Sequence, residues 1–481
     1  MRRLLLTAVL VASCGPTAVI ASPTPGVSLG ASPSSAVAIG SGVFDGARAR
    51  EHIAYLADGA RGGRYSGSPG YLDAAQYVAD QFKAIGLEPL GDGGSYFQRF
   101  TMPIVDLAAT PVLARTGADA KSWKHRVDFT ETVGGRSGNG TAEAPVVVVG
   151  GGAKGNGQDD FAGVTTRGRI ALVTGPTVGT AIESSFAEGA VGVLVVGDPS
   201  IRYSFTPRFF GETIPVLALT ESAANELLAP AGRTVAQVQS AVRARRSDPT
   251  APSPAFDTNV TVRMSLLLTP VHDVEAVNVV GLLRGNDTEL AKRAVLVGGH
   301  LDGVGTDPDG TVFTAANDNA SGPAVTIEVA RALAAKRSEL TRSIVFVAWA
   351  GEEEGLLGSE AYVARMAVSP GRLESLVAYL NLDVIGCCGN TLEASDESAA
   401  LVARLRSAAQ RLGVPFQSVR GGGSDQTTFA KRGVPSSLIL WSDYILHTPR
   451  DTIAVIETPR LQKAGDVVTA VALELGRGEG P

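Results

Sequence analysis

The sequence predicts an α/β protein in which helices cover both faces of a sheet, with a second, β-rich module inserted into the chain. From about residue 275 onward, apolar strands alternate with amphipathic helices, a pattern typical of an α/β sheet. Residues 135–250 instead show short apolar strands and glycine-rich turns. Several of the later strands end at histidine or carboxylate residues, and ligands bind beyond the carboxyl ends of such strands.

The N-terminal region has the composition of an export signal followed by a linker. A basic start precedes an apolar run over residues 4–12, and small residues follow, so we expect residues 1–21 to be a signal peptide. Residues 11–14 also resemble a bacterial lipobox, in which Cys14 would carry a lipid anchor. Residues 22–41 carry no charge and are rich in small residues and proline, which indicates a linker.

Composition favours a folded enzyme. Hydrophobic residues make up 44% of the chain and charged residues 19%, which is typical of globular proteins. No later apolar run reaches about 18 residues, so we expect no transmembrane segment in a protein that is secreted, extracellular or periplasmic, or lipid-anchored. A net charge of −6 without a long basic run argues against nucleic acid or an anionic membrane as the main partner, and we expect a small or peptidic substrate. The oligomeric state stays open at this point.

The chain has three cysteines, and an exported location therefore brings no disulfide framework with it. Cys387 and Cys388 are adjacent. We expect two small buried thiols in a turn rather than metal ligands, and a strained vicinal disulfide is the alternative.

The length exceeds one ordinary domain, and shifts in composition suggest its division. The expected parts are residues 42–134 for the first piece of the main domain, 135–255 for the insert and 256–481 for the second piece. Apolar residues recur at helical spacing over 47–58 and 70–86, and Gly86 ends the second helix.

The insert is expected to hold strands at 146–149, 170–173, 191–196 and 214–219 and a helix at 180–189. Residues 169–173, 187–194 and 214–216 resemble the protease-associated domain, which is inserted in several exopeptidases. The glycine-rich residues 150–157 lack the Gly-Lys-Ser/Thr ending of a phosphate loop, so we expect an ordinary loop there.

The second piece alternates strands and helices. The expected strands are 277–283, 295–298, 344–349, 376–382 and 437–440, and the expected helices are 320–336 and 396–412. His300 follows one of these strands, with Asp302 two residues later on the same side of an extended segment. Metal-bound histidines usually donate their second N–H to such a carboxylate, whereas a lone histidine in a turn would be unremarkable.

Carboxylates follow two further strands and precede one helix. Asp318 lies immediately before a helix, where it could cap the helix or bridge two cations. Glu352, Glu353 and Glu354 follow the strand at 344–349, and their mutual repulsion falls if positive charge lies nearby. One glutamate could then bind a metal while its neighbour transfers protons.

Asp383 and His447 complete the set. Asp383 ends an apolar strand, and His447 precedes a turn in which Asp451 could orient the imidazole ring. Two histidines with three carboxylates suit zinc or cobalt better than magnesium, which prefers oxygen ligands alone.

The order H-x-D, N-D-x-x-S-G, E-E-x-G-L-L-G-S, N-x-D and H-T-x-x-D-T resembles the M28 family of di-zinc exopeptidases, aminopeptidases in particular. The resemblance covers residues 45–125 and 260–475. It implies a three-layer sandwich with a mixed, mostly parallel sheet and two Zn²⁺ ions, for which Co²⁺ or Mn²⁺ could substitute. It further implies one zinc on His300 and Asp383, the other on Glu353 and His447, Asp318 between them and Glu352 as the base. We place Asp302 with Glu352 among the catalytic residues, because it could hold the imidazole of His300.

Two positions depart from the family pattern. Some members have tyrosine directly before the last histidine, where it holds the oxyanion, but this chain has Leu446 there and Tyr444 two residues earlier. The loop that normally shapes the substrate pocket contains Ser424 and Asp425, followed by Gln426 where histidine or tyrosine is common. Tyr444, Ser424 and Asp425 are therefore the candidate substrate residues, and the preferred substrate stays open.

Three alternatives to an aminopeptidase share this fold. A carboxypeptidase would need a cation for the substrate carboxylate, which Arg420 could supply. Glutaminyl cyclases generally use one zinc, so a full set of five ligands argues against that activity. Some relatives have lost their metals and act as binding receptors. The presence of all five metal ligands argues against that role here.

Overall fold

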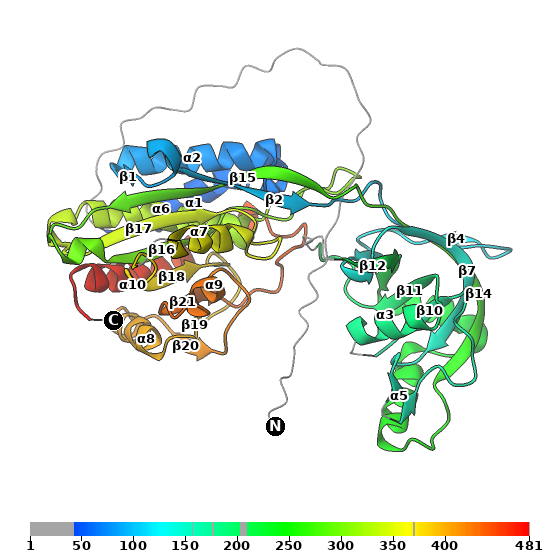
Figure 1. The fold of residues 1–481 in the computed structure, drawn as a ribbon. Coiled ribbons are helices and arrows are strands. Elements are labelled where there is room, and N and C mark those ends of the chain that lie inside the picture. The colour runs from blue at the N-terminus through cyan, green and yellow to red at the C-terminus, as the bar shows by residue number, and fades with distance from the viewer. Residues whose placement is uncertain (1–42, 156, 176–177, 203–208, 369–370, 481) are drawn as a thin grey trace, which may run out of the picture. The chain divides into compact units, whose positions relative to one another are not determined.

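The computed structural model describes residues 43–480 except 156, 176–177, 203–208 and 369–370. The expected signal peptide, Cys14 and the linker lie outside the described residues. The described chain forms two compact units (Figure 1), the smaller containing Pro103–His272 with Asp307–Gly310, and the larger containing the rest.

The larger unit is built on a mixed sheet with the strand order β1-β15-β17-β16-β18-β21-β19-β20, and β2 also pairs with β15. Its strands are β1 (Glu88–Pro89), β2 (Phe97–Ile104), β15 (His272–Leu283), β16 (Ala294–His300), β17 (Ser343–Trp349), β18 (Leu376–Leu382), β19 (Leu392–Ser395), β20 (Phe416–Val419) and β21 (Ser436–Trp441). The four central strands β17, β16, β18 and β21 run parallel, whereas β15 is antiparallel to β17 and β19 is antiparallel to β21. The expected mixed, mostly parallel sheet is confirmed.

Helices cover both faces of this sheet. The helices are α1 (Gly46–Leu56), α2 (Pro69–Ile85), α6 (Ser321–Ala334), α7 (Leu357–Ala367), α8 (Ala399–Arg411), α9 (Gln426–Ala430) and α10 (Thr458–Gly476). Trp349 of β17 packs on Tyr362 of α7 and Phe429 of α9, with ring centroids 5.1 and 5.9 Å away. Phe346 lies three positions earlier, on the opposite face, and its ring centroid is 6.4 Å from that of Phe82 of α2. The expected three-layer α/β sandwich is therefore confirmed.

Local sequence accounts for the ends of α2. Ser68 precedes the helix and accepts a hydrogen bond from the N–H of Tyr71, and Pro69 occupies the first turn. Gly86 ends the helix with a positive φ of 86°, a conformation that costs glycine little. The helix expected at 70–86 thus ends at the predicted glycine.

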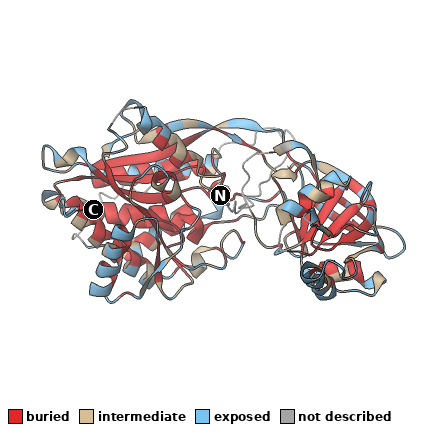
Figure 2. Cartoon of the chain, turned by 60° about the horizontal axis from the view of Figure 1, so that its bottom comes forward, coloured by how far each residue is buried: buried red, intermediate tan, exposed pale blue. Residues whose placement is uncertain are grey.

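The smaller unit contains an eight-stranded sheet in the order β4-β3-β14-β7-β10-β11-β13-β5. These strands are β3 (Val112–Arg115), β4 (Lys121–Ser122), β5 (Phe129–Thr132), β7 (Gly140–Val149), β10 (Ile170–Val173), β11 (Gly192–Val196), β13 (Val216–Leu219) and β14 (Ala255–Leu266). Short pairs are formed by β6 (Gly135–Ser137) with β12 (Phe209–Ile214) and by β8 (Lys154–Gly155) with β9 (Gln158–Asp159), and the helices are α3 (Val178–Ala187), α4 (Glu221–Leu228) and α5 (Val235–Ser247). Figure 2 shows buried residues along the strands of each unit.

This unit begins earlier and ends later than the insert expected at 135–255. The long strand β14 pairs with both β7 and β3, and these pairings bring residues on both sides of the predicted boundaries into one sheet. None of the helices in the described part of the chain combines the length and apolar character of a membrane span.

Candidate metal centre

The predicted metal ligands lie at one edge of the main sheet. His300 ends β16, Asp383 directly follows β18, and Glu353 lies four residues beyond the end of β17. Because these strands are parallel neighbours (Figure 1), their carboxyl ends meet at the same edge. His447 comes from the segment that follows β21, the next parallel strand.

Asp318 enters this edge from the segment before α6. Its neighbour Asn319 takes the capping role, because the Asn319 side chain accepts a hydrogen bond from the N–H of Gly322 at 2.7 Å. The amide of Asn319 also donates to the carbonyl of Leu382 at the end of β18. Asp318 is therefore not needed as a helix cap, and its carboxylate extends toward the two histidines.

The five side chains form two groups that share Asp318. His300, Asp318 and Asp383 make one group, and Asp318, Glu353 and His447 make the other, with the potential ligand atoms of each group within 4.8 Å of one another. Nε2 of His300 lies 3.3 Å from Oδ1 of Asp383 and 3.4 Å from Oδ1 of Asp318. Nε2 of His447 lies 3.0 Å from Oδ2 of Asp318 and 3.1 Å from Oε2 of Glu353.

Electrostatics shows that this cluster requires positive charge. Burial disfavours a charged His300, yet Asp383 and Glu352 together raise its pKa well above the ordinary value. Burial likewise opposes the charge of Asp318, but His300 and His447 hold the pKa of its carboxyl well below the usual range. Burial raises the pKa of Glu353, and the nearby carboxylate of Asp318 raises it further. Protonated histidines thus compensate carboxylates that crowd together.

The side chains present fit a pair of metal ions. Imidazole nitrogens and carboxylate oxygens are the ligands that zinc accepts, and each group offers three of them. Oε1 of the buried Glu353 has no hydrogen-bond partner in the described structure, as expected of an oxygen reserved for a cation. The shared Asp318 has one oxygen near each histidine, which suits a carboxylate that bridges two ions.

Asp302 lies behind His300 and is fully buried. Its Oδ1 is 3.6 Å from Nδ1 of His300, and its Oδ2 accepts a hydrogen bond from the N–H of Glu353 at 3.2 Å. One carboxylate therefore contacts a ligand of each group, and its contact with Nδ1 leaves Nε2 of His300 directed at Asp318 and Asp383.

Asp451 has a different role from the one expected. The sequence suggested that it would orient His447, but its two oxygens accept the N–H groups of Asn317 and Asp318 at 2.7 and 2.9 Å. It therefore fixes the backbone that carries the shared ligand. The side chain of Asn317 is held in turn by Asp443, to which it donates at 2.5 Å, and by the N–H of Gly386 at 2.7 Å.

Glu352 lies beside the two groups without belonging to either. Its Oε2 is 3.9 Å from Nε2 of His300, and its side chain is 11% exposed. Burial raises the pKa of Glu352 well above its ordinary value, and Asp425 and Asp383 add to the rise while His300 opposes it. A carboxyl group with a raised pKa is suited to both accepting and releasing a proton.

The candidate substrate residues differ in their surroundings. Ser424 and Asp425 are buried, and the hydroxyl of Ser424 accepts a hydrogen bond from Asn381, in β18, at 3.0 Å. Burial raises the pKa of Asp425 to about 7. Ser424 therefore contacts a residue near the end of β18. Tyr444 is 76% exposed, and its role in binding the oxyanion stays a prediction.

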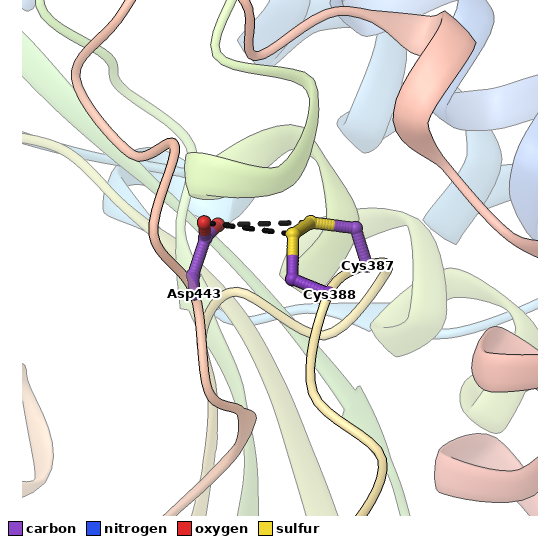
Figure 3. A group of neighbouring side chains, drawn as sticks. All are labelled: Cys387, Cys388 and Asp443. Carbon is purple, nitrogen blue, oxygen red and sulfur yellow. Dashed lines mark hydrogen bonds between the residues drawn. A yellow bond between two sulfur atoms is a disulfide. The ribbon is translucent and has the colours of Figure 1, made fainter.

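Cys387 and Cys388 form a vicinal disulfide, so the expectation of two free thiols was wrong. Figure 3 shows both sulfur atoms facing the carboxylate of Asp443, at 3.6 Å from Cys388 and 3.9 Å from Cys387. The two sulfurs and Asp443 could also be considered a metal-binding group, but the disulfide bond removes the thiolates that a metal would bind.

Sequence reasoning missed Arg64. It lies in the turn between α1 and α2 and is completely buried. Its guanidinium donates to the carbonyl of Leu301, which follows His300, and to that of Ala315, which lies shortly before Asp318. Nothing in the short motif Gly62-Gly63-Arg64 indicates those contacts, which join positions more than 200 residues apart in the chain.

Comparison with known proteins identifies the domain. Residues 278–472 match the family model described as peptidase family M28. This part of the chain is therefore similar to an M28 peptidase domain. The matched segment includes β16, β17, β18 and β21 and all five candidate ligands, so the M28 domain coincides with the metal-binding edge.

Curated relatives of the M28 domain are described as aminopeptidases. The aminopeptidase YwaD of Bacillus subtilis (strain 168) is 35% identical over 201 residues, covering 38% of this chain and 42% of the relative. An aminopeptidase of Pseudomonas aeruginosa is 28% identical over 349 residues, covering 70% of this chain and 56% of the relative. The chain thus spans about half the length of the curated relatives it matches.

Solved structures share the fold over most of the chain. A zinc aminopeptidase from Bacillus subtilis superimposes with a TM-score of 0.64 at 23% identity, covering 90% of this chain and 95% of the other. An aminopeptidase from Aneurinibacillus sp. strain AM-1 gives a TM-score of 0.62 at 21% identity, covering 90% and 94%. These similarities establish a common fold.

Proposed function

We propose that this protein is a zinc-dependent aminopeptidase that removes N-terminal residues from peptides. The observation that carries the proposal is the pair of three-ligand groups joined by Asp318, with Glu352 beside them but outside both. The M28 domain and relatives described as aminopeptidases support the reaction class, and a structural relative described as a zinc aminopeptidase supports the metal.

Two Zn²⁺ ions would be held by residues that the structure brings together. His300 and Asp383 would hold one, Glu353 and His447 the other, and Asp318 would contact both. When bound, such ions polarise a substrate carbonyl and lower the pKa of a nearby water. Co²⁺ or Mn²⁺ would be the expected substitutes, because they accept the same mixture of nitrogen and oxygen ligands.

Glu352 would be the general base. Its carboxylate takes a proton from the attacking water and then delivers it to the leaving amine of the cleaved peptide bond. The raised pKa of Glu352 suits this double role, because a carboxyl group of ordinary pKa would release a proton readily but accept one poorly at neutral pH. Asp302 would assist by holding the ring of His300 and the N–H of Glu353.

The remaining parts of the chain support an exported enzyme. We propose that the smaller unit is a protease-associated module, on the resemblance of its strands β10, β11 and β13 to that domain. We also propose that residues 1–21 direct export, giving a secreted, periplasmic or lipid-anchored protein. Peptides would be the substrates in that location.

The test is cleavage of aminoacyl anilides and of their N-acetylated twins by the purified mature protein, with and without chelator and added zinc. An aminopeptidase cleaves only the free-amine substrates, loses that activity with chelator and regains it with zinc. Cleavage of both sets alike, or of neither, would contradict the proposal and direct attention to a carboxypeptidase, a cyclase or a binding protein.

A further inference from the structure

Arg64 is a buried cation whose partners are backbone carbonyls. Its Nε donates to Leu301 at 2.8 Å, Nη1 to Leu56 and Thr314 at 2.9 Å each, and Nη2 to Ala315 at 2.8 Å. Within the described residues it forms no salt bridge, and none of its side chain is exposed to solvent. Burying a charge is costly unless it gains strong hydrogen bonds, so these contacts must be specific.

The four carbonyls belong to the segments that carry metal ligands and to the end of α1. Leu301 lies between His300 and Asp302, and Thr314 and Ala315 directly precede the segment Ala316–Ala320, which contains Asp318. The guanidinium of Arg64 therefore joins two stretches of backbone. One follows His300, and the other precedes Asp318, the ligand that the two groups share.

The charge of Arg64 also complements the acidic residues of this region. Burial lowers the pKa of Arg64 to about 10, and Asp451 and Asp302 oppose that fall. Arg64 is thus a cation at neutral pH. It places positive charge near Asp451 and Asp302, the carboxylates that support the two ligand groups.

The turn that carries Arg64 is interleaved with the same segments. The N–H of Gly303 donates to the carbonyl of Arg64 at 3.3 Å, and the N–H of Gly305 donates to that of Gly63 at 3.2 Å. Gly63 has a φ of 72°, and a Cβ there would lie 2.3 Å from the carbonyl oxygen of Gly305. Only glycine fits this position, because the turn packs closely against the segment that follows His300.

We infer that Arg64 is a positioning residue, which sets the spacing between His300 and Asp318 before any metal binds. The inference rests on the two-metal centre of the proposed function. Ligands held in place beforehand lose less conformational freedom when the ion arrives, so fixed loops bind metal more tightly than mobile ones. Arg64 performs this role with its planar fork of donors, which reaches carbonyls in several directions at once.

The variant Arg64→Lys tests the inference. Lysine keeps the charge but has three donors on one nitrogen, so it cannot serve all four carbonyls. We expect zinc affinity, measured by competition with a chromophoric chelator, to fall about tenfold or more, as for the loss of supporting contacts at metal sites. We expect kcat on an aminoacyl anilide to fall at subsaturating zinc while KM stays unchanged, because the substrate contacts are retained.

The matched control is Arg342→Lys. Arg342 is also buried in the larger unit and donates to a backbone carbonyl, that of Leu475, but it precedes β17 and so lies at the strand end away from the ligands. The control should keep wild-type zinc affinity even if both variants unfold at a lower temperature. Wild-type zinc affinity in Arg64→Lys, or an equal loss in both variants, would overturn the inference.

A second measurement needs no variant and decides the matter if Arg64→Lys does not fold. Hydrogen exchange of the Gly303 and Gly305 amides is compared in metal-free and zinc-loaded wild-type protein. Positioning by Arg64 predicts protection in both states, whereas protection that develops only with zinc would show that the metal orders these segments and would overturn the inference. Neither zinc affinity nor exchange depends on peptide cleavage, so failure of the proposed activity is distinguishable from failure of this inference.

Discussion

Asp451→Asn perturbs the shared ligand without removing any ligand. In the native chain the two carboxylate oxygens accept the N–H groups of Asn317 and Asp318 at 2.7 and 2.9 Å. Asparagine offers one oxygen and one NH₂ group, so one backbone N–H must face another donor. A hydrogen bond to a charged group contributes about 1.5 to 3 kcal/mol, and each 1.4 kcal/mol is about tenfold in an equilibrium constant.

We therefore expect zinc affinity to fall by about 10- to 100-fold in Asp451→Asn if that cost appears in metal binding. Burial raises the pKa of Asp451 to about 7, so the titration belongs at about pH 8, where the native side chain is ionised. Zinc is titrated against a competing chelator, with Asp466→Asn as control, because Asp466 is a half-buried acid on α10 bonded to Gln462. Undiminished zinc affinity in a folded Asp451→Asn protein would refute the role assigned to Asp451.

Two further predictions concern protons at the metal-free site. The pKa values of His300 and His447 are raised in the folded state, so the stability they contribute is complete below the ordinary histidine pKa and is lost as pH rises through the raised values. The melting temperature of metal-free protein should thus fall as pH rises above about 6.5, and zinc should abolish that fall, which a pH series of thermal melts with and without zinc would check. Zinc must also displace protons from these rings, so its binding heat near neutral pH should vary with the ionisation enthalpy of the buffer, and a buffer-independent heat would contradict the raised pKa values.

The sheet could be predicted from sequence because its strands are apolar runs with clear ends. Strand β18 has its predicted bounds at Leu376–Leu382, since the run stops at the polar Asp383. The meeting of residues at strand ends could also be predicted. Parallel strands bring their carboxyl ends to one edge of the sheet, and this places His300 beside Asp383.

Other features depend on contacts that local sequence does not encode. Asp451 lies close to His447 in the chain, which suggested a partnership, but its oxygens accept N–H groups 133 and 134 residues away. The bond between Cys387 and Cys388 depends on the path of one turn, and residue type allows either the thiols or the disulfide. Arg64 has carbonyl partners up to 251 residues away, and no motif indicates them.

The most direct test of the two-metal account is the metal content and kcat of Glu352→Gln beside those of the wild type. Because Glu352 lies outside both ligand groups, the account predicts unchanged metal content and a fall in kcat of about 10²- to 10⁴-fold, the range for loss of a general base. Glu360→Gln, which alters a partly exposed acid on α7 paired with Arg432, should keep both values. Turnover close to that of the wild type, or loss of metal from Glu352→Gln, would contradict the account.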